Sequence, residues 1–208
     1  MADYDTLVAT LNRCAERARH EALTLGEVLD SMEEAAYAFI CIILALPFLQ
    51  PLTLGPLSVI GGLTFALLGW QLFRGHPTPV LPKRVRATVM GEKTWEAIIK
   101  ICLKILGWCR PFTRPRYSDW VSGRQGQRIG GLTIAAGGLL MAIPAFGMPF
   151  NNLLPALGIF FACVAELEQD GLMIFVAFFW LVVTVLYFVV VIVALWFLGD
   201  QALAYFRW

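Results

Sequence analysis

The sequence has 208 residues, a length that suits one compact domain with short appendages. Apolar residues make up 59% of the chain, charged residues only 15%, and the mean hydropathy is +0.71. Soluble domains are about 45–50% apolar, so this composition excludes an ordinary soluble domain and indicates an integral membrane protein. The net charge of +1 gives no electrostatic basis for nucleic-acid binding, and we expect no nucleic-acid partner.

The charges are unevenly distributed along the chain. Residues 35–73, 129–165 and 171–199 contain no charged residue, and these three windows hold most of the hydrophobicity. Residues 74–128 carry 12 of the 16 Lys and Arg, whereas residues 1–34 carry eight acidic residues and three Arg. Because positively charged loops stay on the cytoplasmic side of a membrane, we predict that the basic segment is cytoplasmic.

Cysteine and histidine do not form a recognisable ligand set. None of the five cysteines belongs to a CxxC pair, and we interpret them as buried structural thiols. His20 and His76 are the only histidines, too few for a zinc site, so we expect neither a metal nor another cofactor. The polar, acidic N-terminus does not have the pattern of a cleavable signal peptide.

The first 34 residues are predicted to be cytosolic or interfacial helices, with a flexible tail as the alternative. One predicted helix covers residues 6–20, with an apolar face formed by Leu7, Val8, Leu11 and Ala15. Thr24-Leu25-Gly26-Glu27 has the pattern of a capping box, in which a hydroxyl and a carboxylate satisfy free helix N–H groups. The helix that it opens has an apolar face formed by Leu25, Val28, Leu29 and Met32.

The first uncharged window, residues 35–73, is interrupted by prolines. Its apolar run over 35–49 is shorter than the roughly 20 residues that a membrane-spanning helix needs. Three Pro and one Gly between Pro47 and Pro56 exclude regular helix, which we expect to resume at Leu57. We predict a hairpin of two short helices, whose broken centre is either a loop at the membrane surface or a re-entrant segment buried in protein.

The basic middle of the chain, residues 74–128, is predicted to contain a helix over about 84–109. Its apolar stripe comprises Trp95, Ile98, Ile99, Cys102, Ile105, Leu106 and Cys109. Its basic face comprises Lys93, Lys100 and Lys104. A basic amphipathic helix is typical of an anionic membrane surface, and packing on the protein itself is the alternative.

The second uncharged window repeats the order of the first. An apolar helix over 129–143 is followed by a Pro- and Asn-rich break over 144–155, a helix to about Val164, and an acidic exit. At an offset of 97 residues, Ala45-Leu46-Pro47 matches Ala142-Ile143-Pro144, and Gly61 matches Gly158. Paired broken segments of this kind occur in transporters built from internal, often inverted, repeats. Shared membrane composition is the alternative explanation.

The last window, residues 171–199, is long enough for one tilted membrane crossing. With both hairpins returning to the cytoplasm, this crossing places residues 200–208 outside. The predicted fold is therefore all-α and polytopic, with two Pro-broken hairpins, an amphipathic helix between them and a long C-terminal transmembrane helix. Its predicted divisions are 1–34, 35–73, 74–128, 129–170 and 171–208.

Several segments resemble the ExoD family of bacterial inner-membrane proteins. The resemblance covers about residues 23–195. It rests on Thr24–Glu27, on Ala45-Leu46-Pro47, on Asn152-Leu153-Leu154-Pro155-Ala156-Leu157 and on Glu168-Gln169-Asp170-Gly171. This resemblance implies a multi-pass protein of the inner membrane that is linked to exopolysaccharide synthesis.

Three acids beside apolar helices, Glu166, Glu168 and Asp170, are the first candidate site residues. Ionisable groups at the edge of a membrane are expensive unless they are hydrated or paired, and they often have a function. We predict a proton- or cation-binding site in which Arg74 or Arg128 pairs with an acid. The alternative is a solvated loop whose acids cap the helix that begins at residue 171.

Amide and hydroxyl groups in the two breaks are the second set of candidates. Asn151 and Asn152 in the second break, and Gln50 and Thr53 in the first, could bind a sugar or a phosphate headgroup. Ordinary turn formation is the alternative. Structural roles are predicted for Pro47, Pro51, Pro56, Gly61, Pro144, Pro149, Pro155, Gly158 and Gly171.

No phosphate-binding loop, nucleophile elbow or metalloprotease pattern is present, and we expect no enzymatic activity. Two functions remain as hypotheses. The first is a transporter-like protein that moves a lipid-linked saccharide, a lipid or an ion. The second is a scaffold or regulator of an exopolysaccharide assembly complex, with assembly proteins as partners. A chain this short can barely enclose a path, so we expect membrane lipids and a second copy as further partners.

Overall fold

The computed structural model describes residues 9–10, 12–14, 16–17, 23–32, 35–51, 54–89, 91–114, 116–145 and 147–205. Within these residues the chain is helical and no strand is formed, which confirms the predicted all-α class. The helices of four or more residues are α2 (Leu25–Met32), α3 (Ala36–Ala45), α4 (Pro56–Phe73), α5 (Lys83–Arg86), α6 (Glu92–Cys109), α7 (Gly123–Met141), α8 (Leu153–Glu168) and α9 (Gly171–Tyr205). Two short 3₁₀ turns are η2 (Leu46–Phe48) and η3 (Ser118–Trp120).

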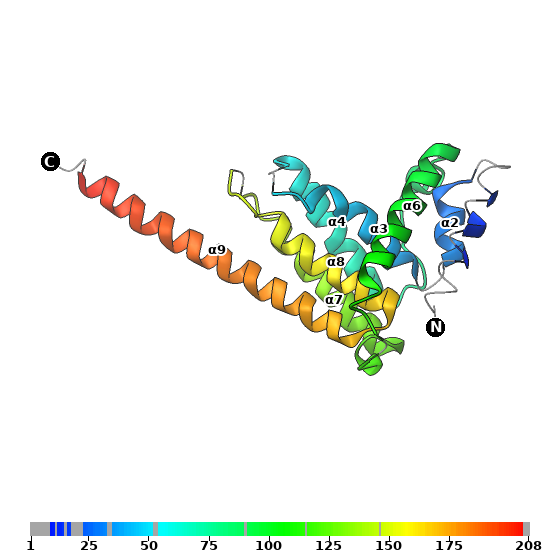
Figure 1. Ribbon diagram of the computed structural model, residues 1–208. Coiled ribbons are helices and arrows are strands. Elements are labelled where there is room, and N and C mark those ends of the chain that lie inside the picture. Colours follow the sequence, from blue (N-terminus) through cyan, green and yellow to red (C-terminus); the bar gives the residue numbers. More distant parts are fainter. Residues whose placement is uncertain are drawn as a thin grey trace.

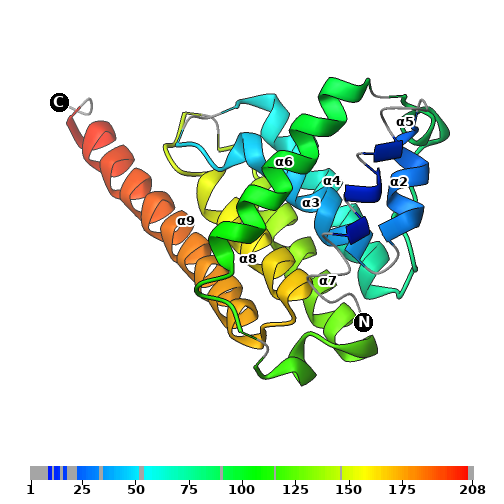
Figure 2. The same cartoon turned by 45° about the vertical axis from the view of Figure 1, so that its right-hand side comes forward.

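Helices α3, α4, α7, α8 and α9 form one bundle in which each helix runs opposite to the one before it (Figures 1 and 2). The contact between α4 and α7 is the most extensive between any two described helices. Helix α8 packs against α3, α7 and α9, and its small residues Ala156, Ala162 and Ala165 are fully or almost fully buried. The core of the protein therefore lies around α8.

The contact between α4 and α7 is made by backbone. A Cβ atom added to Gly69 would lie 2.5 Å from the Gly131 carbonyl oxygen, and one added to Gly138 would lie 2.6 Å from that of Gly62. The same clashes occur in the reverse direction, from Gly131 to Gly69 and from Gly62 to Gly138. Each helix places its two glycines seven residues apart, and so on one face. Small residues allow two helices to approach to backbone contact, as is common in membranes.

Both proline-rich breaks lie at the same end of the bundle (Figures 1 and 2). The Gly62–Ala142 approach joins the start of α4 to the end of α7, which brings the two breaks together. Helices α3 and α7 therefore run in the same direction, as do α4 and α8. An inverted repeat would give the two hairpins opposite orientations, so the inverted arrangement is not the one that the structure has.

The other end of the bundle carries the charges. Arg74 directly follows α4, and Arg124 and Arg128 lie in the first turns of α7. Glu166 and Glu168 lie in the last turn of α8. The bundle therefore has one uncharged end formed by the two breaks and one charged end. This polarity follows from the uncharged windows of the sequence together with the alternating helix directions.

Two described helices, α4 and residues Gly171–Phe197 of α9, are long and apolar enough to cross a membrane. In the most apolar 18-residue window of α9 only 17% of the residues are buried in the protein, which is not the pattern of a soluble core helix. Its last buried residue among those described is Phe188, and beyond it α9 projects away from the bundle (Figure 1). Helix α4 presents a second exposed apolar stripe, formed by Leu57, Ile60, Leu63, Leu67 and Trp70. These unpaired apolar faces indicate a membrane protein.

The N-terminal segment docks on the end of α5, on the residues that follow it and on the start of α6. The predicted capping box is confirmed: the Glu27 N–H donates to the Thr24 hydroxyl at 3.3 Å, and the Thr24 N–H donates to Glu27 Oε2 at 2.8 Å. An Arg86–Asp30 ion pair and a Leu25 N–H bond to the Thr88 carbonyl at 3.0 Å join α2 to α5. Trp95 of α6, 1% exposed, completes this contact. Of the predicted helix over 6–20, Leu7, Val8, Leu11 and Ala15 lie outside the described residues.

Three predicted boundaries are wrong. The helix predicted over about 84–109 is divided into α5 and α6, because the chain leaves the helix at residues 87–89, where Val89 pairs with Thr24. Helix α7 begins at Gly123, six residues before the predicted start, because charged residues at a solvated helix end do not prevent helix formation. Helix α8 begins at Leu153, which places Pro155 in its first turn, where a missing N–H costs no hydrogen bond.

The neighbouring glycines of α7 test the backbone contact. A Cβ at Gly131 would lie 2.5 Å from the Phe73 nitrogen, whereas one at Gly130 would have no atom within 4 Å. We expect Gly131→Ala to lower the free energy of unfolding by about 1–3 kcal/mol, because the helices must separate. Gly130→Ala should be neutral or raise it by up to about 1 kcal/mol. Thermal unfolding of both variants in detergent makes the comparison, and equal unfolding temperatures would contradict this contact.

The capping box should weaken at acidic pH. Donation by the Thr24 N–H, and secondly by its hydroxyl, holds the pKa of Glu27 below its usual value of 4.5. A carboxyl with a lowered folded-state pKa contributes stability above its unfolded-state pKa and loses it as the pH falls through the folded-state pKa. Hydrogen-exchange protection of the first α2 amides should therefore fall below about pH 4.5. Glu27→Gln should remove this pH dependence, and an unchanged profile in that variant would refute the explanation.

Candidate functional site

Asp170 is fully buried at the corner between α8 and α9. Its Oδ1 accepts a hydrogen bond from the Leu172 N–H at 2.9 Å and one from Arg116 Nε at 3.2 Å. Its Oδ2 accepts from the Arg114 N–H at 3.1 Å. One carboxylate therefore caps α9 and also holds the chain that arrives from α6. The capping alternative holds for Asp170, but the residue is buried in a network and is not in a solvated loop.

The residues beside Asp170 complete this corner. Gln169 has a left-handed backbone with φ of 51°, ends α8, and accepts a hydrogen bond from the Ser122 hydroxyl at 2.9 Å. The Gly171 N–H donates to the Arg116 carbonyl at 2.8 Å. A Cβ at Gly171 would lie 2.4 Å from the Tyr117 carbonyl oxygen, so no larger residue fits. Residues 168–171, which we call the corner segment, thus fasten the segment 113–122 to the bundle.

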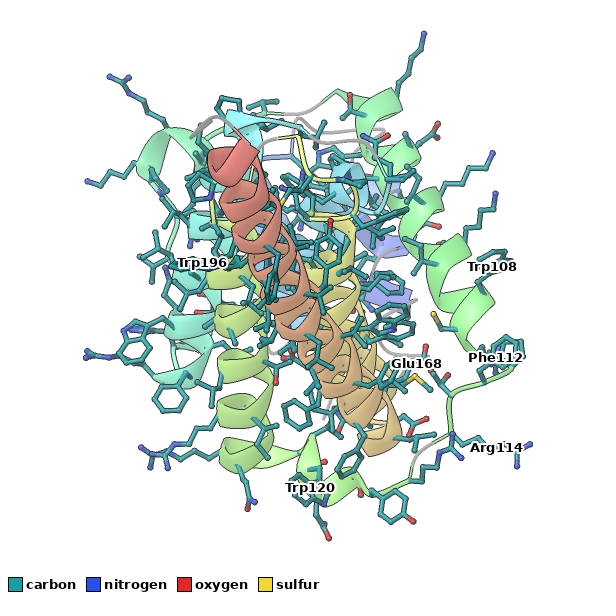
Figure 3. All side chains as sticks on the ribbon, turned by 90° about the vertical axis from the view of Figure 1, so that its left-hand side faces the viewer. Trp108, Phe112, Arg114, Trp120, Glu168 and Trp196 are labelled. Atoms are coloured by element: carbon teal, nitrogen blue, oxygen red, sulfur yellow. The ribbon has the colours of Figure 1, made fainter. Side chains whose placement is uncertain are left out.

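Glu168 lies on the same side of the corner as Asp170. The Thr113 hydroxyl is 3.3 Å from Glu168 Oε2 and 3.1 Å from the Cys109 carbonyl oxygen. Figure 3 shows Glu168 between the end of α8 and the segment that carries Phe112 and Arg114. Burial, and secondly the Glu168 carboxylate, raise the pKa of the Cys109 thiol, which keeps this thiol protonated. Glu166 instead lies near Tyr37 of α3. The structure therefore brings Glu168 and Asp170 together but leaves Glu166 apart.

The arginines predicted to pair with these acids lie elsewhere. Arg74 is exposed and its guanidinium stacks over the Trp70 ring, 5.4 Å from the ring centre. Arg128 is exposed on the first turns of α7. The charged partner of Asp170 is Arg116, which the sequence analysis did not single out. Arg116 lies in a Pro- and aromatic-rich segment, and its position opposite the corner depends on contacts across 54 residues.

The asparagines lie at the opposite, uncharged end of α8. Asn151 is 3% exposed and its Nδ2 donates to the Ala145 carbonyl at 3.0 Å. Asn152 is 1% exposed, does not cap α8 through its side chain, and finds no hydrogen bond to its amide group among the described residues. The hydroxyl of Tyr187, on α9, donates to the Pro149 carbonyl and ties this break to α9.

The first break contributes less to the uncharged end. Gln50 is half-buried, and Thr53 lies outside the described residues. The matched glycines also have different neighbours, since Gly61 packs on the Phe48 ring and Gly158 packs on Leu181 of α9. The other predicted structural residues lie where expected, with Pro47 in η2, Pro56 at the start of α4, and Pro51, Pro144 and Pro149 in the connections.

The predicted site residues therefore form two clusters. The acids and the asparagines are separated by the 16 residues of α8, or about 24 Å at 1.5 Å per residue. The acidic cluster has the character of a structural joint, and the two asparagines form a buried polar cluster. Among the described residues, no group of three or more His, Cys, Asp or Glu could hold a metal ion.

Comparison with known proteins identifies the family. A family model described as "Exopolysaccharide synthesis, ExoD" matches residues 7–190. The chain belongs to the ExoD family. Protein ExoD of Rhizobium meliloti (strain 1021) is 28% identical over 201 residues, which cover 97% of this chain and 83% of that protein. The uncharacterized protein slr1875 of Synechocystis sp. is 27% identical over 154 residues, or 74% of this chain and 71% of that protein. No solved structure matches the chain.

The ExoD family implies a role in exopolysaccharide synthesis, and the exposed apolar helices agree with a membrane protein. The corner segment is one of the segments on which the resemblance to the ExoD family rests. Each of its four residues contacts the linker between α6 and α7. Glu168 meets Thr113, Gln169 meets Ser122, Asp170 meets Arg116, and Gly171 admits the Tyr117 backbone. Sequence reasoning missed Thr113, Arg116 and Ser122, and the only local signal was the unusual density of Arg, Pro and aromatic residues around them.

The Asp170 joint is testable by stability. Asp170→Ala removes a helix cap and leaves the linker unfastened, and we expect it to lower the free energy of unfolding by about 3 kcal/mol. Asp170→Asn keeps an acceptor for the Leu172 N–H and should cost roughly half as much. Asp119→Asn, at an exposed acid of η3, is the matched control and should change nothing. If Asp170→Ala unfolded at the same denaturant concentration as the control, the joint would not be a stabilising contact.

Proposed function

We propose that this chain is a transporter-like component of exopolysaccharide synthesis that moves a lipid-linked saccharide across the inner membrane. The observation that carries this proposal is the buried Asn152 amide at the uncharged end of the bundle. A buried polar group without a partner is costly, by about 1–3 kcal/mol, and is retained where it binds something. Amide groups donate to and accept from sugar hydroxyls, and the adjoining breaks supply further backbone polar groups.

The proposed topology follows the two ends of the bundle. The charged end, with residues 74–128 and the N-terminal segment, would lie in the cytoplasm, and the two breaks would lie at the far membrane surface or re-enter from it. Helix α9 would cross from the cytoplasm and place residues 200–208 outside. Helix α6, which ends near the charged end of α8, would lie in the cytoplasmic interface.

Two further features agree with transport. The hairpins α3–α4 and α7–α8 share one orientation, as expected of a parallel repeat about the membrane normal, an arrangement found in one class of transporters. The small bundle leaves the outer half of α9 uncovered, including exposed Val189, Ile192 and Trp196. A second copy of the chain packed on this half would complete a path that one copy is too small to enclose.

Asn152→Leu tests the transport proposal. Because the amide has no hydrogen bond to lose among the described residues, we expect unchanged or higher stability and normal abundance in the membrane. Exopolysaccharide output in a complemented deletion strain should nevertheless fall about fivefold to tenfold, the effect of one lost hydrogen bond to substrate.

Asn151→Ala is the matched comparison, since the Nδ2 of Asn151 already bonds the Ala145 carbonyl and only its Oδ1 has no hydrogen bond among the described residues. This variant should lower stability by about 1 kcal/mol, so that any loss of output follows its abundance. Normal output from an abundant Asn152→Leu protein would remove the transport proposal.

A scaffold for an exopolysaccharide assembly complex is the second candidate function. It is favoured by the corner segment, which uses the acids to fasten the linker and so fixes how the basic face of α6 is presented. Crosslinking in native membranes distinguishes the two functions. A scaffold should yield adducts of α6 with another protein, whereas a transporter should yield only adducts between copies of itself.

A further inference from the structure

A large apolar groove lies between α6 and the bundle, with a volume of about 1150 Å³. Its walls are Leu46 and Leu49 beside η2, the second half of α6 with the residues after it, Leu157 and Phe161 of α8, and Met173 of α9. We call this space the α6 groove. It is larger than the roughly 300–1,000 Å³ of an ordinary small-molecule pocket, and it is lined almost entirely by carbon. Such a space accommodates a long hydrocarbon chain better than a saccharide.

The orientation of α6 explains why the groove exists. Figures 1 and 2 show α6 crossing α3 and α8 at an angle, so that the helices diverge on either side of the crossing. Trp95 fixes one end of α6 to the N-terminal segment, and Thr113 and the corner segment fix the chain just beyond its other end. The apolar side chains in between cannot all reach α8, which leaves the space that another molecule would fill.

The groove has one positively charged side chain among its lining residues. Lys104 lines it, and exposed Lys100 lies one turn earlier on α6. Neither lysine forms an ion pair with an acid among the described residues. An apolar cavity with a basic residue in its wall is complementary to a molecule with hydrocarbon chains and an anionic head.

Two exposed aromatic residues lie at the edge of the groove. Trp108 and Phe112, 81% and 74% exposed, extend from its edge away from the bundle (Figure 3). Exposed aromatic residues at the end of an amphipathic helix are typical of the boundary between lipid headgroups and chains.

We propose that the α6 groove is a specific site for an anionic phospholipid of the surrounding bilayer. Its acyl chains lie between α6 and α8, and its phosphate is bound by Lys104. The bound lipid covers the apolar faces that α6 cannot bury against α8. This site is separate from Asn152 and does not depend on the transport proposal.

The test uses the full chain in vesicles of phosphatidylcholine and phosphatidylglycerol, with bromine on the acyl chains of one lipid at a time. Bromine quenches tryptophan fluorescence on contact. The difference in quenching between the parent protein and Trp108→Phe is the contribution of Trp108, and this contribution reports on the groove. We expect brominated phosphatidylglycerol to occupy the site with about fivefold preference over brominated phosphatidylcholine, the effect of one lysine beside an anionic headgroup.

Two pairs of variants separate the groove from general charge and apolar effects. Lys104→Gln should abolish the preference, whereas Lys93→Gln, which removes the same charge near the start of α6, should retain it. Gly107→Leu fills the groove from a position where a Cβ has free space, and it should reduce the quenching of Trp108. Ala97→Leu, at an exposed position on the same helix, should not.

Three outcomes overturn the proposal. Equal quenching by the two lipids removes headgroup recognition, whatever the effect of Gly107→Leu. If Lys104→Gln and Lys93→Gln lowered the preference for phosphatidylglycerol equally, the preference would come from the net charge of α6 and not from the groove. If an equimolar long-chain isoprenyl phosphate displaced brominated phosphatidylglycerol, the ligand of the groove would be a lipid-linked precursor and not a phospholipid of the bilayer. Circular dichroism of each variant, unchanged from the parent, shows that lost quenching is not lost folding.

Discussion

The backbone contact between α4 and α7 is the constraint on which the arrangement of the bundle depends. Gly62 and Gly69 oppose Gly138 and Gly131, and in each case a methyl group would overlap the partner backbone. Because the two helices meet in antiparallel register over most of their length, the hairpins to which they belong must share one orientation. Both breaks then lie at one end, and all the charged helix ends lie at the other. Dispersion between closely packed backbones, rather than hydrophobic burial, supplies this contact in a lipid environment.

The charged end is organised by a single buried carboxylate. The Asp170 carboxylate accepts a hydrogen bond from the Leu172 N–H in the first turn of α9, and it binds both the backbone and a side chain of the linker after α6. A buried acid needs this many partners, because desolvation of an unpaired carboxylate would cost several kcal/mol. The consequence reaches beyond the corner itself. By fixing residues 113–122, Asp170 sets the end of α6, and the angle of α6 creates the groove beside α8.

Polar chemistry is thereby divided between two ends of one helix. At the charged end Glu168 and Asp170 bond the linker after α6. At the uncharged end the Asn152 amide forms no hydrogen bond among the described residues. A membrane protein that handles an amphiphilic molecule has use for this separation, because the anionic and saccharide parts of such a molecule are recognised by different groups. Cations on α6 suit the former, and amides in the breaks suit the latter.

The sequence by itself determined the helical class, the three uncharged windows, the capping box at Thr24, the long α9 and the family. These are local properties: hydropathy and proline act on neighbouring residues, and a capping box closes within four. The seven-residue spacing of glycines in α4 and α7 is visible in the sequence, but the sequence does not show that these glycines contact each other. Tertiary structure alone decided the partner of Asp170, the common orientation of the hairpins, the distance between acids and asparagines, and the groove. Each depends on contacts between residues far apart in the chain, such as Arg116 and Asp170 or Gly62 and Gly138, and no local pattern specifies which distant residue will be met.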